Sequence, residues 1–295
     1  MTRDAIDMAR KRKMEKEDDY SLVKIVASKK HHLLKNEGIE ILIFGDDMTV
    51  RRLAATKVIH ADGTFKCVLH RYSQLHILHA TMENNLSLPV LFCLLKGKNQ
   101  QTYEKLLGMI EELANEAGLR ILNREVQLMC DFELAMINAV QQRDSLMKVK
   151  CCFFHDVQSV FRNSRDAVNA AENAAGQNAE KLRLVLQAIR RIMMLPLVPE
   201  ELITNELVDL IMAASTNGRT HPLRELMALR DYILRTYVGK RNAGSGTVLR
   251  PRFPPALWCV SGMASRTNNA AESINAQINP EVNGKLPVFV FLRIL

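Results

Sequence analysis

The sequence predicts an α/β fold: a mixed five-stranded sheet with flanking helices, interrupted by a mainly helical insertion that precedes Glu272. Short β-branched or apolar runs predict the strands, and amphipathic segments between the later runs predict the helices. We expect a charged N-terminal segment over residues 1–38 and the first part of the core over 39–156. The strand pattern is lost over 157–250, the expected insertion, and residues 251–295 would complete the core.

The first three strands are expected to follow one another directly. Residues 57–61 form a β-branched run that ends at Asp62-Gly63, and residues 74–82 and 88–95 are the next candidates. A polar stretch, residues 83–85, separates the last two and is typical of a hairpin turn. We therefore expect an antiparallel meander.

Helices and strands alternate after the meander. Apolar residues at helical spacing predict the first long helix over residues 101–117. Residues 126–130 are the next strand, 132–140 the next helix, and 148–154 the fifth strand, which ends at His155. Strands joined by helices in this way predict a mixed sheet with crossover connections.

Composition favours an anionic partner and an intracellular setting. The formal net charge is +8 and the pI is about 9.2, a balance that suits nucleic acid. Six cysteines occur, and the adjacent Cys151 and Cys152 lie in an apolar run, which favours a reducing compartment. We expect neither a secretory signal nor a membrane span, and the basic residues 10–13 are compatible with nuclear import.

Three acidic residues stand where a metal site on a sheet would need them. Asp62 ends the first strand, Asp131 follows the fourth and Glu272 opens a helix after the insertion. They are 131 − 62 = 69 and 272 − 131 = 141 residues apart, separations that only a shared sheet would bring together. Carboxylates suit Mg²⁺ or Mn²⁺, and two such ions about 4 Å apart assist phosphodiester cleavage.

Each acid also has a purely structural interpretation. Aspartate before glycine is common in turns, which would explain Asp62. Asp131 precedes a helix and would serve as its N-cap. Asn269 and Glu272 have the spacing of a capping box.

An ordered series of short sequence words carries further information. They are Ala61-Asp62-Gly63-Thr64-Phe65-Lys66, Gln74-Leu75, Leu88-Pro89-Val90, Thr102-Tyr103, Cys130-Asp131-Phe132-Glu133, Cys152-Phe153-Phe154-His155 and Arg266-Thr267-Asn268-Asn269-Ala270-Ala271-Glu272. From about residue 41 to the end, this series resembles the transposase domain of Mutator-like elements, the MULE family.

The resemblance implies an RNase H-like domain with a helical insertion before the last acid. It implies that Asp62, Asp131 and Glu272 form a DDE triad that binds Mg²⁺ or Mn²⁺. The family's Cys-x-x-His element falls on Cys152 and His155, which together are only half of a zinc site.

The resemblance also implies a role in positioning DNA. We assign this role to five residues, namely Cys152, His155, Arg266, Asn268 and Asn269.

The chain departs from the family pattern in three places. Residues 1–40 lack the spacing of a zinc-dependent DNA-binding domain, and Asn275 stands where the family usually has histidine. Residues 286–295 form an apolar tail, from which we expect an incomplete copy of the gene.

These observations lead to three hypotheses. The first is a nuclear DNA transposase that cuts and transfers strands and assembles as a homo-oligomer on DNA. The second is a domesticated, catalytically inactive DNA-binding protein, for which salt-sensitive, metal-independent binding is expected. The third, a nuclease acting on RNA or hybrid duplexes, shares the fold but is not favoured by the sequence word from Arg266 to Glu272.

Overall fold

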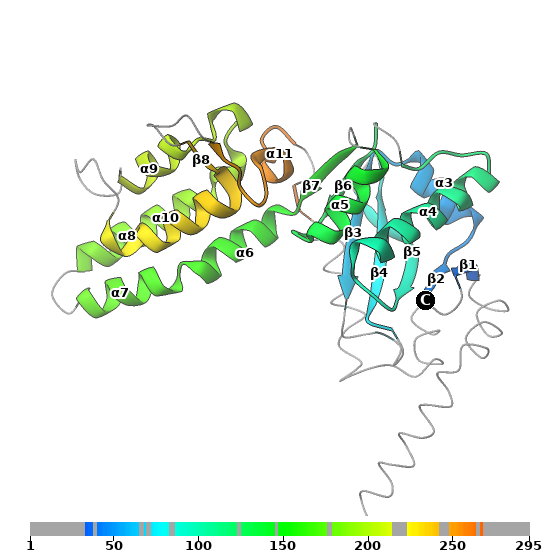
Figure 1. Cartoon of the computed structure of the whole chain (residues 1–295), viewed down its shortest axis with the longest axis horizontal. Helices are drawn as coiled ribbons and strands as arrows, with labels where there is room; N and C mark the ends of the chain where they lie inside the picture. The colour runs from blue at the N-terminus through cyan, green and yellow to red at the C-terminus, as the bar shows by residue number, and fades with distance from the viewer. Residues whose placement is uncertain are drawn as a thin grey trace, which may run out of the picture. The chain divides into compact units, whose positions relative to one another are not determined.

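The structure is a computed structural model that comprises two compact units. It describes residues 33–37, 40–64, 68, 72–82, 86–122, 125–144, 147–175, 179–213, 223–241, 248–263 and 266–267. One unit, the sheet unit, comprises Met1–Val149 with Asn268–Leu295, and the other, the helical unit, comprises Lys150–Thr267. Both are drawn in Figure 1.

Within the described residues, seven strands form a mixed sheet in the order β1-β2-β5-β4-β3-β6-β7. The strands are β1 (Leu33–Glu37), β2 (Ile41–Phe44), β3 (Val58–Thr64), β4 (Gln74–Thr81), β5 (Ser87–Leu95), β6 (Gln127–Cys130) and β7 (Lys148–Cys151). β3, β4 and β5 pair antiparallel, whereas β6 lies parallel to β3. The expected α/β class and the antiparallel meander are therefore confirmed.

The expected number of five strands is wrong. β1 pairs with β2, and β2 pairs with β5, so two additional strands extend the sheet beyond the meander. All four residues of β2, from Ile41 to Phe44, are buried. An apolar run without alternation is ambiguous in sequence because both faces of the strand are covered.

Among its described residues, the sheet unit has three helices: α3 (Asp47–Ala55), α4 (Gln100–Glu116) and α5 (Leu134–Arg143). Asp46 caps α3, since its carboxylate accepts the Thr49 N–H at 2.7 Å and the Thr49 hydroxyl accepts the Asp46 N–H at 2.9 Å. Gly118 has φ +69 just after α4, a conformation that favours glycine at a helix end. α4 and α5 contact each other, and Figure 1 shows both beside the strands.

Helices make up most of the helical unit, as the sequence predicts for residues 157–250. The described α-helices are α6 (Phe153–Asn163), α7 (Arg165–Ala175), α8 (Ala179–Met193), α9 (Asn205–Ala213), α10 (Met227–Ile233) and α11 (Pro255–Trp258). They are joined by three short 3-10 helices, η1 (Leu195–Leu197), η2 (Glu200–Leu202) and η3 (Arg224–Leu226), by the π-helix η4 (Leu234–Val238), and by β8 (Lys240–Arg241) paired with β9 (Val248–Leu249). α8 contacts α6, α7 and α9.

The fifth predicted strand is shorter than expected. β7 ends at Cys151, and α6 begins at Phe153, so His155 lies in the first turn of a helix rather than at a strand end. Residues 151–154 are apolar, and an apolar run of this length does not distinguish a strand from the buried start of a helix.

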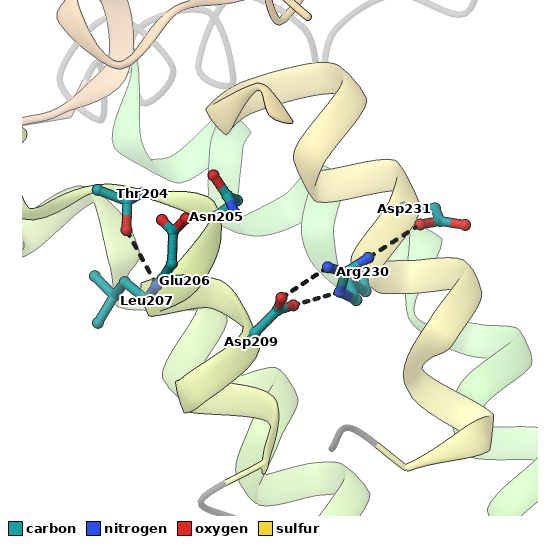
Figure 2. A network of polar contacts seen from close by, with 7 residues as sticks. All are labelled: Thr204, Asn205, Glu206, Leu207, Asp209, Arg230 and Asp231. Carbon is teal, nitrogen blue, oxygen red and sulfur yellow. Dashed lines mark hydrogen bonds and ion pairs between the residues drawn. The ribbon is translucent and has the colours of Figure 1, made fainter. Parts of the chain in front are cut away.

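A fork of charged hydrogen bonds joins two helices of the helical unit. Figure 2 shows the Arg230 guanidinium of α10 bound to both carboxylate oxygens of Asp209 on α9, with Nη2 donating to Oδ2 at 2.7 Å. Arg230 also lies 3.5 Å from the Asp231 carboxylate. The Thr204 hydroxyl accepts the Leu207 N–H at 3.2 Å at the start of α9.

Among the helices that the structure describes, none combines the length and apolar character needed to cross a bilayer.

Candidate functional site

The parallel pairing of β3 with β6 puts the first two predicted acids at corresponding ends of adjacent segments, Asp62 within β3 and Asp131 directly after β6. His60 lies opposite Met129, and all pairs in this register differ by the same 129 − 60 = 69 residues. Asp62 and Asp131 have the same separation, and each follows the last of these paired residues by two positions. Neighbouring strands are about 4.8 Å apart, so the two acids lie on adjacent segments at the same end of the β3–β6 pair.

The structure removes the turn interpretation of Asp62. Asp62 and Gly63 both lie inside β3, where they pair with Ile77 and His76 of β4. Asp62 is buried, with 7% of its surface exposed. A buried carboxylate within a strand carries a desolvation cost that a turn residue does not have.

Gly63 is explained by a close approach within the sheet. A Cβ atom at this position would lie 2.7 Å from Oε1 of Gln74 and 3.5 Å from Nδ1 of His76. Gln74 is 1% exposed, and two hydrogen bonds hold its amide in place. Glycine therefore allows these side chains of β4 to pack directly over β3, on the face opposite to the Asp62 side chain.

The capping interpretation of Asp131 is also wrong. α5 begins at Leu134, and its N-cap residue is Glu133, which makes no side-chain cap. Asp131 lies two residues earlier, half-buried, in a tight turn in which its carbonyl accepts the Glu133 N–H at 2.7 Å.

A chain of buried polar groups ends on this turn. Nε2 of Gln74 donates to the Gly97 carbonyl at 3.1 Å and to the Tyr103 hydroxyl at 2.9 Å, and that hydroxyl donates to the Glu133 carboxylate at 2.9 Å. Burial raises the pKa of Tyr103, and the nearby Glu133 carboxylate raises it further. Burial likewise raises the pKa of Glu133, an effect that Asp131 reinforces and the Tyr103 hydroxyl opposes.

Two histidines of β4 are buried, and one of them, His76, interacts with Asp131. Burial lowers the pKa of His76 to about 4, although Asp131 acts in the opposite direction. Burial, with His60 and His76 nearby, also lowers the pKa of His79 to about 4. Both imidazoles are therefore neutral at pH 7, and the His76 ring lies 5.6 Å from the Tyr103 ring between centroids.

The Cys-x-x-His element lies at the start of α6 in the helical unit. Cys152 is fully buried and is the N-cap residue of α6, and His155 is half-buried in its first turn. The Arg266 carbonyl accepts the Phe153 N–H at 3.1 Å, while the Arg266 side chain is exposed. The structure thus brings Arg266 next to Cys152, although 114 residues (266 − 152) separate them.

The donor chemistry of the acids fits a divalent cation. Asp62 and Asp131 supply oxygen ligands, which Mg²⁺ and Mn²⁺ prefer. No group of three or more His, Cys, Asp or Glu side chains arranged to hold a metal ion occurs within the described ranges. Glu272, the third predicted ligand, lies outside the described residues, as do Asn268 and Asn269.

Three residues of the polar chain were given no role by sequence reasoning: Gln74, Tyr103 and Glu133. They stand in the short words that carry the family resemblance, and this was the only signal available. Their hydrogen bonds join residues up to 30 positions apart, which no local pattern reveals.

A comparison with known protein families matches the part of the chain that contains the first two acids. The MULE transposase domain matches residues 58–159, from the first residue of β3 into α6. This stretch contains Asp62, Asp131, Cys152 and His155. No curated protein and no solved structure shows a match to the chain.

Proposed function

Because residues 58–159 form a MULE transposase domain, we propose that the chain is the catalytic part of a DDE transposase that cleaves and transfers DNA strands. The observation that carries this proposal is the parallel pairing of β3 with β6 at a constant 69-residue offset, the same offset that separates Asp62 from Asp131. A transposase domain acts on DNA, and the net charge of +8 suits that partner.

The order of the strands supports an RNase H-like fold as part of the proposal. β3 lies between its antiparallel partner β4 and its parallel partner β6, and the helices α4 and α5 precede β6 and β7. In such a sheet, the ends of the central strands are a natural place for convergent ligands.

The acids would hold the cations on which the chemistry depends. When bound, Mg²⁺ or Mn²⁺ supplies Lewis-acid activation and neutralises charge on the phosphodiester. Asp62 is fixed within a strand, and Asp131 is fixed by the turn before α5, so both carboxylates are held before substrate arrives. We include Glu272 as the third ligand.

The proposed reaction has two steps. Water replaces the 3′ oxygen at a phosphorus atom and leaves a 3′ hydroxyl and a 5′ phosphate. The 3′ hydroxyl then displaces a 3′ oxygen at a phosphodiester of the target DNA.

We assign Cys152, His155, Arg266, Asn268 and Asn269 to positioning the DNA. The exposed guanidinium of Arg266, anchored through its backbone at the start of α6, is suited to a phosphate contact. Action on chromosomal DNA would take place in the nucleus, and we propose that the protein assembles as a homo-oligomer on DNA.

Cleavage of labelled duplex DNA by the purified full chain, with Mg²⁺ or Mn²⁺, tests the proposal. Asp131→Asn removes one ligand charge without changing the size of the side chain. Asp47→Asn is the matched control, because Asp47 is an exposed acid in the first turn of α3 and has no proposed role in binding the cation. DNA binding is measured in parallel over a range of salt concentrations.

Metal-dependent nicking that is retained in Asp47→Asn and lost in Asp131→Asn is the expected result. Salt-sensitive binding without nicking by any variant would refute catalysis and identify a domesticated DNA-binding protein.

A further inference from the structure

The buried hydrogen bonds that run from Gln74 through Tyr103 to Glu133 can donate in only one direction. The Gly97 carbonyl can only accept, so the Gln74 group that faces it must be the NH₂. The same NH₂ donates to the Tyr103 oxygen, which leaves the Tyr103 proton for the Glu133 carboxylate. Every contact in the chain is therefore a defined donor–acceptor pair.

These hydrogen-bonded groups differ from a network of surface side chains because they are shielded from water. Gln74 is 1% exposed and Tyr103 is not exposed at all. A buried polar group without its partner carries a large desolvation cost, so each member holds its neighbour in place. Tyr103 thereby links β4 and the end of β5 to the turn before α5.

The turn connects the last member of the chain to the second acid. Glu133 receives the Tyr103 hydrogen bond through its side chain, and its N–H donates to the Asp131 carbonyl at 2.7 Å. The Glu133 carbonyl also accepts the Ile137 N–H at 3.1 Å, within the first turn of α5. Movement of the Glu133 side chain would therefore move the backbone that presents Asp131.

We propose that Tyr103 is a positioning residue, whose hydroxyl acts through Glu133 to hold the Asp131 carboxylate in the geometry that binds a divalent cation. This inference rests on the proposed function for the identity of the ligand. The claim that Tyr103 holds the turn at Asp131 through Glu133 does not depend on that function. The ring of Tyr103 fills the core as phenylalanine would, so the hydroxyl is the part with the positioning role. Loss of such an outer hydrogen bond typically weakens metal binding by about 10- to 100-fold.

The test compares Tyr103→Phe with wild type in the full chain by two measurements. Amide hydrogen exchange of a peptide spanning residues 131–134 reports on the turn. Enhancement of water-proton relaxation by Mn²⁺ alone, without DNA, gives the affinity for the cation. Tyr237→Phe is the matched control, because it removes a buried tyrosine hydroxyl in the helical unit.

A second comparison tests the route through Glu133. Glu133→Ala should weaken Mn²⁺ binding as much as Tyr103→Phe or more. Adding Tyr103→Phe to Glu133→Ala should cause no further loss, because the acceptor of the hydroxyl is already absent. A purely structural effect of the hydroxyl on the core would instead add to the loss.

We expect faster exchange of the turn and at least about 10-fold weaker Mn²⁺ binding in Tyr103→Phe, with neither change in Tyr237→Phe. Unchanged exchange, unchanged Mn²⁺ affinity relative to a wild type that binds the ion, or additive effects of the two substitutions would overturn the inference. If wild type binds no Mn²⁺, the proposed function fails instead, and faster exchange of the turn would still support the positioning of Asp131 by Tyr103.

Discussion

Asp156, in the helical unit, is a buried acid whose protonation should control stability. It lies in the first turn of α6, is 3% exposed, and borders a cavity of about 10 Å³. The other residues that line the cavity are Val160, Ile192, Leu195, Ile233, Tyr237 and Trp258. In these largely apolar surroundings, burial raises the pKa of Asp156 from 3.8 to about 7.

The direction of the effect follows from proton binding. Between the two pKa values, the folded state binds more protons at Asp156 than the unfolded state does, so stability falls as pH rises. The difference between 3.8 and about 7 is about 3 pH units, each worth about 1.4 kcal/mol. The wild type should therefore lose about 3 kcal/mol of unfolding free energy between pH 4 and pH 7 through this group alone, and about 4 kcal/mol over the full range of the two titrations.

Asp156→Asn should remove this dependence, because the amide does not ionise. Trp258 is the only tryptophan in the chain and lines the same cavity, so its fluorescence reports unfolding of this region. Urea unfolding of the full chain, followed at Trp258 from pH 4 to pH 8, gives the free-energy difference between variant and wild type. Glu172→Gln on α7 is the control, since Glu172 is exposed.

The variant should gain stability relative to wild type as pH rises, by up to about 4 kcal/mol, whereas the control should not. Parallel curves for Asp156→Asn and wild type across this range would refute the reasoning, because they would mean that Asp156 ionises with its ordinary pKa.

Three further experiments test the packing and one ion pair. Gly63→Ala should lower the unfolding free energy by about 1–3 kcal/mol in thermal unfolding, because its Cβ would lie 2.7 Å from Gln74 Oε1; an unchanged melting temperature would show that the amide moves aside freely. A double-mutant cycle of Arg230→Ala and Asp209→Ala should give a coupling of about 0.5–1 kcal/mol that weakens in salt, and a coupling of zero would make the fork incidental. Trp258→Phe should lower the unfolding free energy by about 2–4 kcal/mol, because the indole N–H donates to two backbone carbonyls at 3.0 and 3.2 Å. Urea unfolding followed by circular dichroism measures this loss, and an unchanged unfolding free energy would contradict the prediction.

The sequence was most informative where local patterns decide structure. The predicted helix over residues 101–117 agrees with α4 within one residue at each end, because Asn99 caps its start and Gly118 allows its end. The strand before Asp131 is also found, as β6. Apolar spacing and capping residues are local, and they were sufficient for these elements.

Elements that depend on distant partners were predicted less well. β1, Leu33–Glu37, pairs with β2 at the edge of the sheet, but its sequence is charged and has no alternating pattern. His155 was expected at a strand end because apolar residues continue through Phe154, whereas α6 already begins at Phe153. Tertiary contacts determine both outcomes.

For the candidate site, the sequence suggested which acids to consider as ligands but not what holds them in place. The 69-residue separation of Asp62 and Asp131 is visible in the sequence, but its meaning depends on the parallel register. The link from Tyr103 to Glu133 spans two elements and is visible only in the folded chain.

The most direct test of the central claim is Mg²⁺-dependent cleavage of duplex DNA by wild type, Asp62→Asn and Asp131→Asn, compared at equal concentrations of folded protein. If the two carboxylates jointly hold the catalytic cations, wild type cleaves, and each single variant loses cleavage while still binding DNA. Cleavage that persists in either variant would contradict the account.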